Sequence, residues 1–228
     1  MTQQLVSYFL AVYLIGSIPV GDLLARLFHR ESVLKPGEWT TKDSGDVFRI
    51  LGMKLGLLVT VLDILKGWLA ISPLLVNLAR PTPDQAVWVM CLGGVLAVFG
   101  HCHSIFLGFR GGKGLAPTAG VLFTILPVPA FVSFLFWAAI SFWGLSVRPG
   151  AVSAAGVMPI ASILYIYFIA PEKLDFLYVV AALSIFTMWE YRVNLLSYMG
   201  FGATTPPPPP NPASQPSESD PSASTGSK

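Results

Sequence analysis

Residues 55–78 read LGLLVTVLDILKGWLAISPLLVNL, an almost continuous apolar run. A helix needs about 20 such residues to cross the hydrocarbon core of a membrane, so this run is long enough to span it. Its charged side chains, Asp63 and Lys66, are three positions apart and would share one helix face. Because ionisable groups within a span are costly and usually face a polar interior, the pair is either part of a functional site or a structural ion pair.

Further apolar runs lie on both sides of this one, at Leu5–Phe28, Ala86–Phe99, Leu115–Leu126, Pro129–Leu145, Ala151–Ile169 and Phe176–Met188. The first is also long enough to span, and no small-x-small cleavage site follows it, so we expect it to be retained. The third and fourth runs along the chain are short, and would span only if extended into loops enclosed by protein. The pattern predicts an all-α integral membrane protein with about seven transmembrane helices, six being the alternative count.

The composition agrees with this class. The 228 residues are 54% hydrophobic and 11% charged, whereas soluble domains carry about 25% charged residues. A net charge of +2 excludes a nucleic-acid binder that works by neutralising phosphates. The two cysteines, Cys91 and Cys102, fit neither a disulfide framework nor a zinc site, and we expect no cofactor.

The chain divides at about residue 202. Residues 203–228 read ATTPPPPPNPASQPSESDPSASTGSK, with no apolar side chain larger than alanine. Such a segment cannot bury enough surface to offset the entropy of ordering, so we expect a disordered proline- and serine-rich tail after a membrane domain at 1–202.

The basic residues predict an orientation. With seven spans, the loops 29–54, 100–114 and 146–150 and the C-terminal stretch lie on one side of the membrane. That side carries ten basic residues, namely Arg26, Arg30, Lys35, Lys42, Arg49, Lys54, Arg110, Lys113, Arg148 and Arg192. The other side carries only Arg80 and Lys173. Because basic residues gather on the cytoplasmic side, we expect these loops in the cytoplasm and the N-terminus outside.

One cytoplasmic loop holds a glycine-rich basic motif. Residues 100–114 read GHCHSIFLGFRGGKG, in which Gly111, Gly112 and Gly114 surround Lys113 at the start of an expected helix. Glycine amides, a helix N-terminus and an ammonium group together can hold a phosphate. The motif is not a Walker A loop, and a flexible basic loop is the alternative. His101 is a candidate acid, base or phosphate donor, or simply an interfacial histidine.

Other polar positions are weaker candidates. The segment Glu31–Gly52, which contains Arg49, is the longest polar stretch, and long loops in compact proteins are often binding loops. Ser153 follows a glycine-marked loop and could serve either a site or close helix packing. Asn194 closes the last apolar run and is a site candidate or an interfacial anchor.

Together these motifs resemble the bacterial acyl-phosphate:glycerol-3-phosphate acyltransferase family, over about residues 10–200. The resemblance rests on GSIP at Gly16–Pro19, DILKG at Asp63–Gly67, GH at Gly100–His101, FLGFRGGKG at Phe106–Gly114, VS at Val152–Ser153 and RVN at Arg192–Asn194. The family implies seven spans with the N-terminus outside, in agreement with the charge count.

The chain also departs from the family pattern. Where the family carries GSGNxGATNxxRxxG, this chain has GEWTTKDSGDVFRILG, which keeps Gly37, Arg49 and Gly52. Ser104 replaces the proline of GHxFP, and Tyr191 replaces the histidine of the final HRxN. The GGKG half of the motif set is kept, whereas much of the first loop is altered.

The resemblance implies transfer of a fatty acyl group from acyl phosphate to the sn-1 hydroxyl of glycerol 3-phosphate. The products are lysophosphatidic acid and phosphate, formed for phospholipid biosynthesis at the cytoplasmic face of the bacterial inner membrane. No HxxxxD motif or Ser-His-Asp arrangement is visible, which agrees with a donor that is already activated. The alternative is a non-catalytic relative that binds a phospholipid or a phosphorylated metabolite. The oligomeric state stays open.

The resemblance also suggests roles for individual residues. Lys113 and the three glycines of GGKG would hold one phosphate, and Arg49 would hold a phosphate from the first loop. Ser153 and Asn194 would position the attacking hydroxyl or the carbonyl group. His101 would donate to a phosphate or relay a proton. Supporting roles are expected for Ser17, Asp63 and Lys66.

Overall fold

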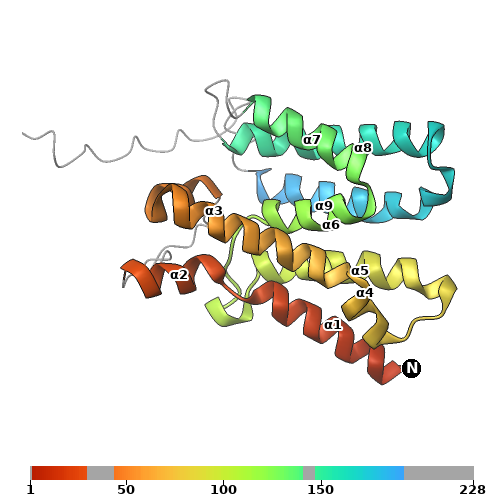
Figure 1. Cartoon of the computed structure of the whole chain (residues 1–228), viewed down its shortest axis with the longest axis horizontal. Coiled ribbons are helices and arrows are strands. Elements are labelled where there is room, and N and C mark those ends of the chain that lie inside the picture. Colours follow the sequence, from red (N-terminus) through yellow and green to blue (C-terminus); the bar gives the residue numbers. More distant parts are fainter. Residues whose placement is uncertain (1, 30–43, 141–146, 193–228) are drawn as a thin grey trace, which may run out of the picture.

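The computed structural model describes residues 2–29, 44–140 and 147–192, and within them the regular elements are helices. The principal helices lie side by side in one bundle (Figure 1). They are α1 (Thr2–Ser17), α2 (Val20–His29), α3 (Ser44–Ile71), α4 (Pro73–Val76), α5 (Pro83–Cys102), α6 (Leu115–Ile125), α7 (Pro127–Ile140), α8 (Val147–Phe168) and α9 (Leu177–Glu190), with 3-10 turns η1 (Asn77–Ala79), η2 (Ile105–Leu107) and η4 (Pro171–Phe176). The prediction of an all-α chain is confirmed for these residues.

The apolar runs found in the sequence coincide with helices, and their outer faces are apolar. By length and composition, the segments Gln3–Phe28, Gln85–Cys102 and Gly150–Phe168 can each cross a membrane. Large apolar side chains such as Ile163 and Ile185 stay exposed on the bundle surface. An apolar exterior of this extent suits lipid rather than water.

The first run is not one straight helix. It breaks after Ser17 into α1 and α2, with Ile18 and Pro19 outside both. Proline has no amide hydrogen and disfavours the helical conformation of the residue before it, so Pro19 both ends α1 and begins a new helix. Figure 1 shows α2 turning away from the axis of α1. Leu55–Leu78 breaks in the same way at Ser72–Pro73, where α3 gives way to α4.

A second bend lies in α3. Gly52 has φ 76° and ψ 172°, a backbone conformation that side chains other than glycine rarely adopt. The first part of α3, residues 44–51, therefore takes a different direction from the long part that follows Gly52. Ala25, Leu51 and Val59 form a small buried cluster that joins α2 to both parts of α3.

Close backbone contacts join α3 to α6. A Cβ added to Gly67 would lie 2.0 Å from the carbonyl oxygen of Pro117, and one added to Gly120 would lie 2.0 Å from that of Ile64. Small residues at these positions let the two helices approach closely, which is a main source of helix association in membranes. The contact brings the DILKG segment of α3 beside the start of α6, directly after GGKG.

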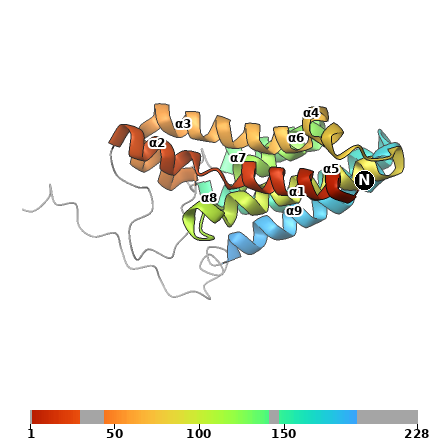
Figure 2. The same ribbon diagram turned by 90° about the horizontal axis from the view of Figure 1, so that it is seen from below.

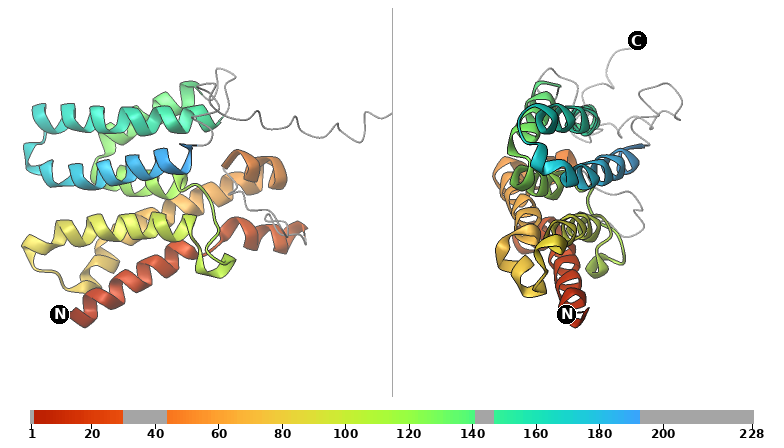
Figure 3. Two further views of the ribbon diagram at one scale, coloured as in Figure 1. Left: turned by 180° about the vertical axis from the view of Figure 1, so that it is seen from behind. Right: turned by 90° about the vertical axis from the view of Figure 1, so that its right-hand side faces the viewer.

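The two ends of the bundle differ. Figure 2 shows α2 and the start of α3 at one end, and the N-terminus with α4 at the other. The loop between α5 and α6 lies at the same end as α2 (Figure 3). The α2 end therefore gathers most of the polar motifs found in the sequence. The tail predicted at 203–228 lies outside the described residues.

Candidate active site

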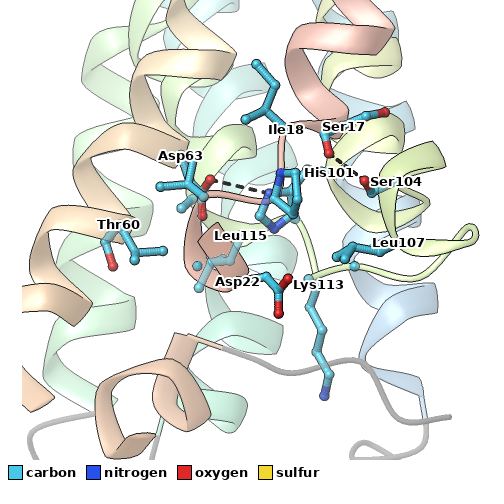
Figure 4. Close-up of a pocket in the computed structure, with 18 of the residues that line it drawn as sticks. Ser17, Ile18, Asp22, Thr60, Asp63, His101, Ser104, Leu107, Lys113 and Leu115 are labelled. Carbon is cyan, nitrogen blue, oxygen red and sulfur yellow. Dashed lines mark hydrogen bonds and ion pairs between the residues drawn. The ribbon is translucent and has the colours of Figure 1, made fainter. Parts of the chain in front are cut away.

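A polar cavity of about 80 Å³ lies at the α2 end of the bundle (Figure 4). Its walls come from the α1–α2 break, α3, the end of α5, the loop that precedes α6, and the end of α9. The polar side chains among its lining residues are Ser17, Asp22, Thr60, Asp63, His101, Ser104, Lys113 and Tyr191. Segments far apart in the sequence thus meet at one place.

Asp63 is the anionic centre of the cavity. Its Oδ1 lies 2.8 Å from Nζ of Lys66 and 3.6 Å from Nδ1 of His101. The Lys66 ammonium also donates to the carbonyl oxygen of Ile18, at the break between α1 and α2. Asp63 and Lys66 are both buried, so the predicted pairing within α3 is confirmed. The ion pair ties the GSIP break to α3 and also holds one side of His101.

The two histidines of the loop face different surroundings. His101 turns Nδ1 towards Asp63, and its Nε2 lies against Gly112. His103 instead stacks on Phe99, with ring centroids 4.6 Å apart, and is not among the residues that line the cavity. Of these two histidines, His101 is therefore the one placed to act on a molecule in the polar cavity.

The loop from His103 to Gly114 folds back on the end of α5. The Ser104 amide donates to the carbonyl oxygen of Arg110 at 3.2 Å, and the Phe109 amide donates to that of Ser104 at 2.8 Å. The Ser104 hydroxyl donates to the carbonyl oxygen of Ser17. Ser104, a departure from the family motif, thus anchors the loop to the end of α1.

The glycines of GGKG are required by packing. A Cβ on Gly111 would lie 2.0 Å from the carbonyl oxygen of His101, and one on Gly112 would lie 2.2 Å from Nε2 of the same residue. The Gly112 amide donates to the His101 carbonyl oxygen at 3.1 Å, so in this structure it does not contribute to an anion cradle. Gly114 has φ 76° and caps the start of α6.

Lys113 is the basic side chain of the motif that lines the cavity. Its ammonium lies over the ring of Tyr191, 4.6 Å from the ring centroid. In Figure 4 its side chain points away from Asp63 and His101. His101 and Lys113 therefore line separate parts of the cavity, whereas Lys66, which pairs with Asp63, is not among the lining residues.

The structure does not bring together all of the predicted site residues. Ser17 is buried and lines the cavity. Ser153 is partly exposed in α8 and is not among the lining residues of the polar cavity. Arg49 lies in α3, but its side chain is outside the part that the structure describes, and Asn194 lies outside the described residues.

Some lining residues were missed by the sequence analysis. Asp22 had a signal, since it pairs with Arg26 four positions later at 2.7 Å. Thr60 had none as a site residue, because a threonine is usual in a membrane helix, and Tyr191 was noticed only as a departure from the family's HRxN motif. Ser104 was noticed only as a departure from the family motif.

An apolar groove of about 420 Å³ lies beside the polar cavity, among α3, α6, α7, α8 and α9. The two hollows share Thr60, Leu115 and Ala116 as lining residues. Among its lining residues, Ala130 of α7 and Met158 of α8 are buried. The polar cavity thus adjoins the apolar groove.

Known proteins match this chain over most of its length. The family model described as glycerol-3-phosphate acyltransferase matches residues 6–199. A glycerol-3-phosphate acyltransferase of Listeria monocytogenes is 34% identical over 199 residues, covering 86% of this chain and 93% of the relative. One of Aquifex aeolicus is 32% identical over 188 residues, covering 80% and 89%.

The fold also matches a solved structure. The crystal structure of PlsY (YgiH), an integral membrane glycerol 3-phosphate acyltransferase in its glycerol 3-phosphate form, superposes with a TM-score of 0.68 at 28% identity. The match covers 87% of this chain and 94% of that one. A second crystal structure of that protein, described as the lysophosphatidic acid form, matches equally well. The family model, the relatives and the fold agree, and the chain belongs to the glycerol-3-phosphate acyltransferase family.

Proposed function

We propose that this protein transfers a fatty acyl group from acyl phosphate to the sn-1 hydroxyl of glycerol 3-phosphate, giving lysophosphatidic acid and phosphate. One observation carries the proposal: the polar cavity and the apolar groove share the walls formed by Thr60, Leu115 and Ala116. A substrate with a phosphate head and an acyl chain can occupy both hollows at once. Its carbonyl carbon would then lie near the shared wall.

The polar cavity suits phosphate groups. Lys113 provides a positive charge at one side, and Gly114 begins α6, whose N-terminus adds a partial positive charge. Arg49, near the start of α3, is proposed as a further cation, since a planar guanidinium suits bidentate contact with phosphate. Ser153 and Asn194 are proposed to orient the hydroxyl or the carbonyl group as substrates bind, although Ser153 is not among the lining residues of either hollow.

The apolar groove suits the acyl chain. Its lining is almost wholly apolar, and its volume lies within the range of about 300–1,000 Å³ that is usual for ligand sites. Leu57 and Phe134 line it and are also exposed on the bundle surface, so the groove opens towards lipid. A chain dissolved in the membrane could enter without crossing water.

The reaction needs little from the protein beyond position and charge. The sn-1 oxygen attacks the carbonyl carbon, the bond from that carbon to the phosphate oxygen breaks, and the departing phosphate takes the hydroxyl proton. Lys113 and Arg49 would neutralise the phosphates, and electrostatic stabilisation of this kind is usually the largest catalytic contribution. His101, whose Nδ1 faces Asp63, would donate to a phosphate through Nε2 in its doubly protonated form.

The proposed setting is the bacterial inner membrane, crossed about seven times. The N-terminus lies outside and the polar cavity faces the cytoplasm. The basic residues support this orientation. Arg26 in α2, Lys54 just after the Gly52 bend in α3 and Lys113 just before α6 belong to segments at the α2 end, whereas Arg80 just before α5 and Lys173 in η4 belong to segments at the opposite end (Figure 1).

Phosphate release by purified protein in detergent tests the function. Palmitoyl phosphate would be supplied with and without glycerol 3-phosphate, with palmitoyl-CoA as the alternative donor. We expect phosphate release only when the acceptor is present, and no acyl transfer from palmitoyl-CoA. Mass spectrometry should identify the product as 1-palmitoyl lysophosphatidic acid. Acceptor-independent hydrolysis would assign a different acceptor, and no turnover by folded protein would favour the phospholipid-binding alternative.

A further inference from the structure

Tyr191 forms part of the polar cavity. It follows α9 as its C-cap residue, and its amide donates to the carbonyl oxygen of Thr187 at 3.0 Å. Its side chain is fully buried, and both it and Lys113 line the cavity. The ring lies beneath the Lys113 ammonium, 4.6 Å from Nζ to the ring centroid. The residue that caps α9 thus contacts the ammonium group of Lys113, which the GGKG loop carries.

The geometry is that of a cation–π interaction. An ammonium within about 6 Å of an aromatic centroid is attracted by the negative face of the ring, and the attraction is stronger where water is excluded. Lysine has a flexible four-carbon stem and otherwise samples many rotamers. The base of Lys113 is fixed because the neighbouring Gly112 packs against His101. The ring of Tyr191 fixes the other end.

We propose that Tyr191 is a positioning residue, which holds the Lys113 ammonium at the polar cavity so that it meets a substrate phosphate without first being ordered. The proposal rests on the proposed function. It gives a physical role to a departure from the family pattern, since Tyr191 stands where the family's HRxN motif has histidine. Pre-ordering of this kind strengthens phosphate binding because less side-chain entropy is lost on contact.

The test varies the electronics of the ring at nearly constant size. Tyr191 is replaced by phenylalanine and by mono-, di- and trifluorinated phenylalanines, and Tyr191→Leu removes the aromatic face. We expect Tyr191→Phe to retain the KM for the phosphate substrates, and the KM to rise stepwise with fluorination. Loss of the whole interaction should raise KM by about tenfold, with a smaller change in kcat. Melting temperatures in detergent show which variants stay folded.

Two controls make the test specific. Trp189→Leu removes an exposed aromatic ring that lies 4.3 Å from the guanidinium carbon of Arg192 near the same helix end, and it should leave KM unchanged. In a Lys113→Ala background, the fluorinated series should lose its trend, because the interacting cation is gone.

Two results would overturn the proposal. One is a KM that does not follow fluorination, and the other is a trend that survives in the Lys113→Ala background. Absence of acyl transfer by the unmodified protein would instead contradict the proposed function. In that case, calorimetric affinity for glycerol 3-phosphate across the same series still decides the role of Tyr191, with a flat series rejecting it.

Discussion

At the scale of single residues, Gly111 and Gly112 show that glycines predicted to bind phosphate can be required by packing. From the sequence, the glycines of GGKG suggested amides free to turn towards a phosphate. In the structure both pack against His101, and the Gly112 amide donates to the His101 carbonyl oxygen. The loop therefore needs glycine here chiefly for close contact, and that contact places Lys113.

Gly112→Ala tests this interpretation. The new Cβ would lie 2.2 Å from Nε2 of His101, so the histidine or the loop must move, and overpacking of this kind costs about 1–3 kcal/mol. We expect a lower melting temperature and loss of acyl transfer. Gly156→Ala is the matched control, because no atom lies within 4 Å of its added Cβ, and alanine should stabilise α8 by up to about 1 kcal/mol. Equal behaviour of the two variants would refute the packing role.

Asp63 offers a second prediction at this scale. Asp63→Asn removes the anion that faces Lys66 and His101 in a buried site. Leaving a buried charge without its partner typically costs about 3–5 kcal/mol, so the variant should unfold at lower temperature. The double variant Asp63→Asn with Lys66→Met should recover part of that loss. Strictly additive losses in thermal unfolding would show that the pair is not coupled.

Sequence reasoning found some site residues and missed others for a physical reason. Asp63, Lys66 and His101 were found because an ionisable group in or beside an apolar run is costly and so implies a polar partner. Tyr191 gave no such signal, since an aromatic residue at the end of a span is usual. Its role depends on a contact with Lys113, which only the tertiary fold reveals.

At the scale of helices, hydropathy located the apolar parts and missed their polar ends. The run Ala86–Phe99 is the middle of α5, which extends from Pro83 to Cys102. The Thr82 amide donates to Oε1 of Gln85 at 3.4 Å, a capping contact that supports the polar first turn. Breaks at Pro19 and Gly52 are encoded locally, but the direction in which α2 and the start of α3 turn depends on their mutual packing.

The apolar groove yields a prediction at this scale. Ala119 lines it from α6, and Ala119→Phe would fill part of the space assigned to the acyl chain. If the phenylalanine excludes two methylenes of the palmitoyl chain from the groove, about 0.8 kcal/mol of burial energy is lost for each, and transfer from palmitoyl phosphate should slow by at least about tenfold. Butyryl phosphate has a shorter chain and should react as before. Ile163→Phe on the exposed surface of α8 is the control. The same relative change in rate for both donors, measured against the unmodified protein, would exclude the groove as the acyl site.

For the whole molecule, the charge asymmetry predicts that the polar motifs share one side of the membrane. The structure places residues of the GSIP, DILKG and GGKG motifs around one cavity, whereas Ser153 is not among its lining residues. The groove could not be predicted from the sequence. Its walls come from α3, α6, α7, α8 and α9, so its shape depends on how these helices pack together.

Orientation in the membrane gives the prediction at this scale. Cys91 and Cys102 are both buried, so an added surface cysteine can be labelled selectively. In spheroplasts, a membrane-impermeant maleimide should label Glu172→Cys from outside, whereas Lys54→Cys should react only after lysis. Both positions are exposed in the folded protein. The reverse labelling pattern would invert the proposed topology.

The central claim is that acyl transfer occurs in the polar cavity beside Lys113. The most direct measurement is the rate of acceptor-dependent phosphate release from palmitoyl phosphate by Lys113→Ala. The comparison is Lys54→Ala, which removes an exposed charge just after the Gly52 bend in α3. Removing one group that stabilises developing charge commonly costs about 100-fold or more, so Lys113→Ala should lose at least that much in kcat/KM while Lys54→Ala keeps the full rate. A folded Lys113→Ala protein that turns over like the unmodified one would contradict the claim.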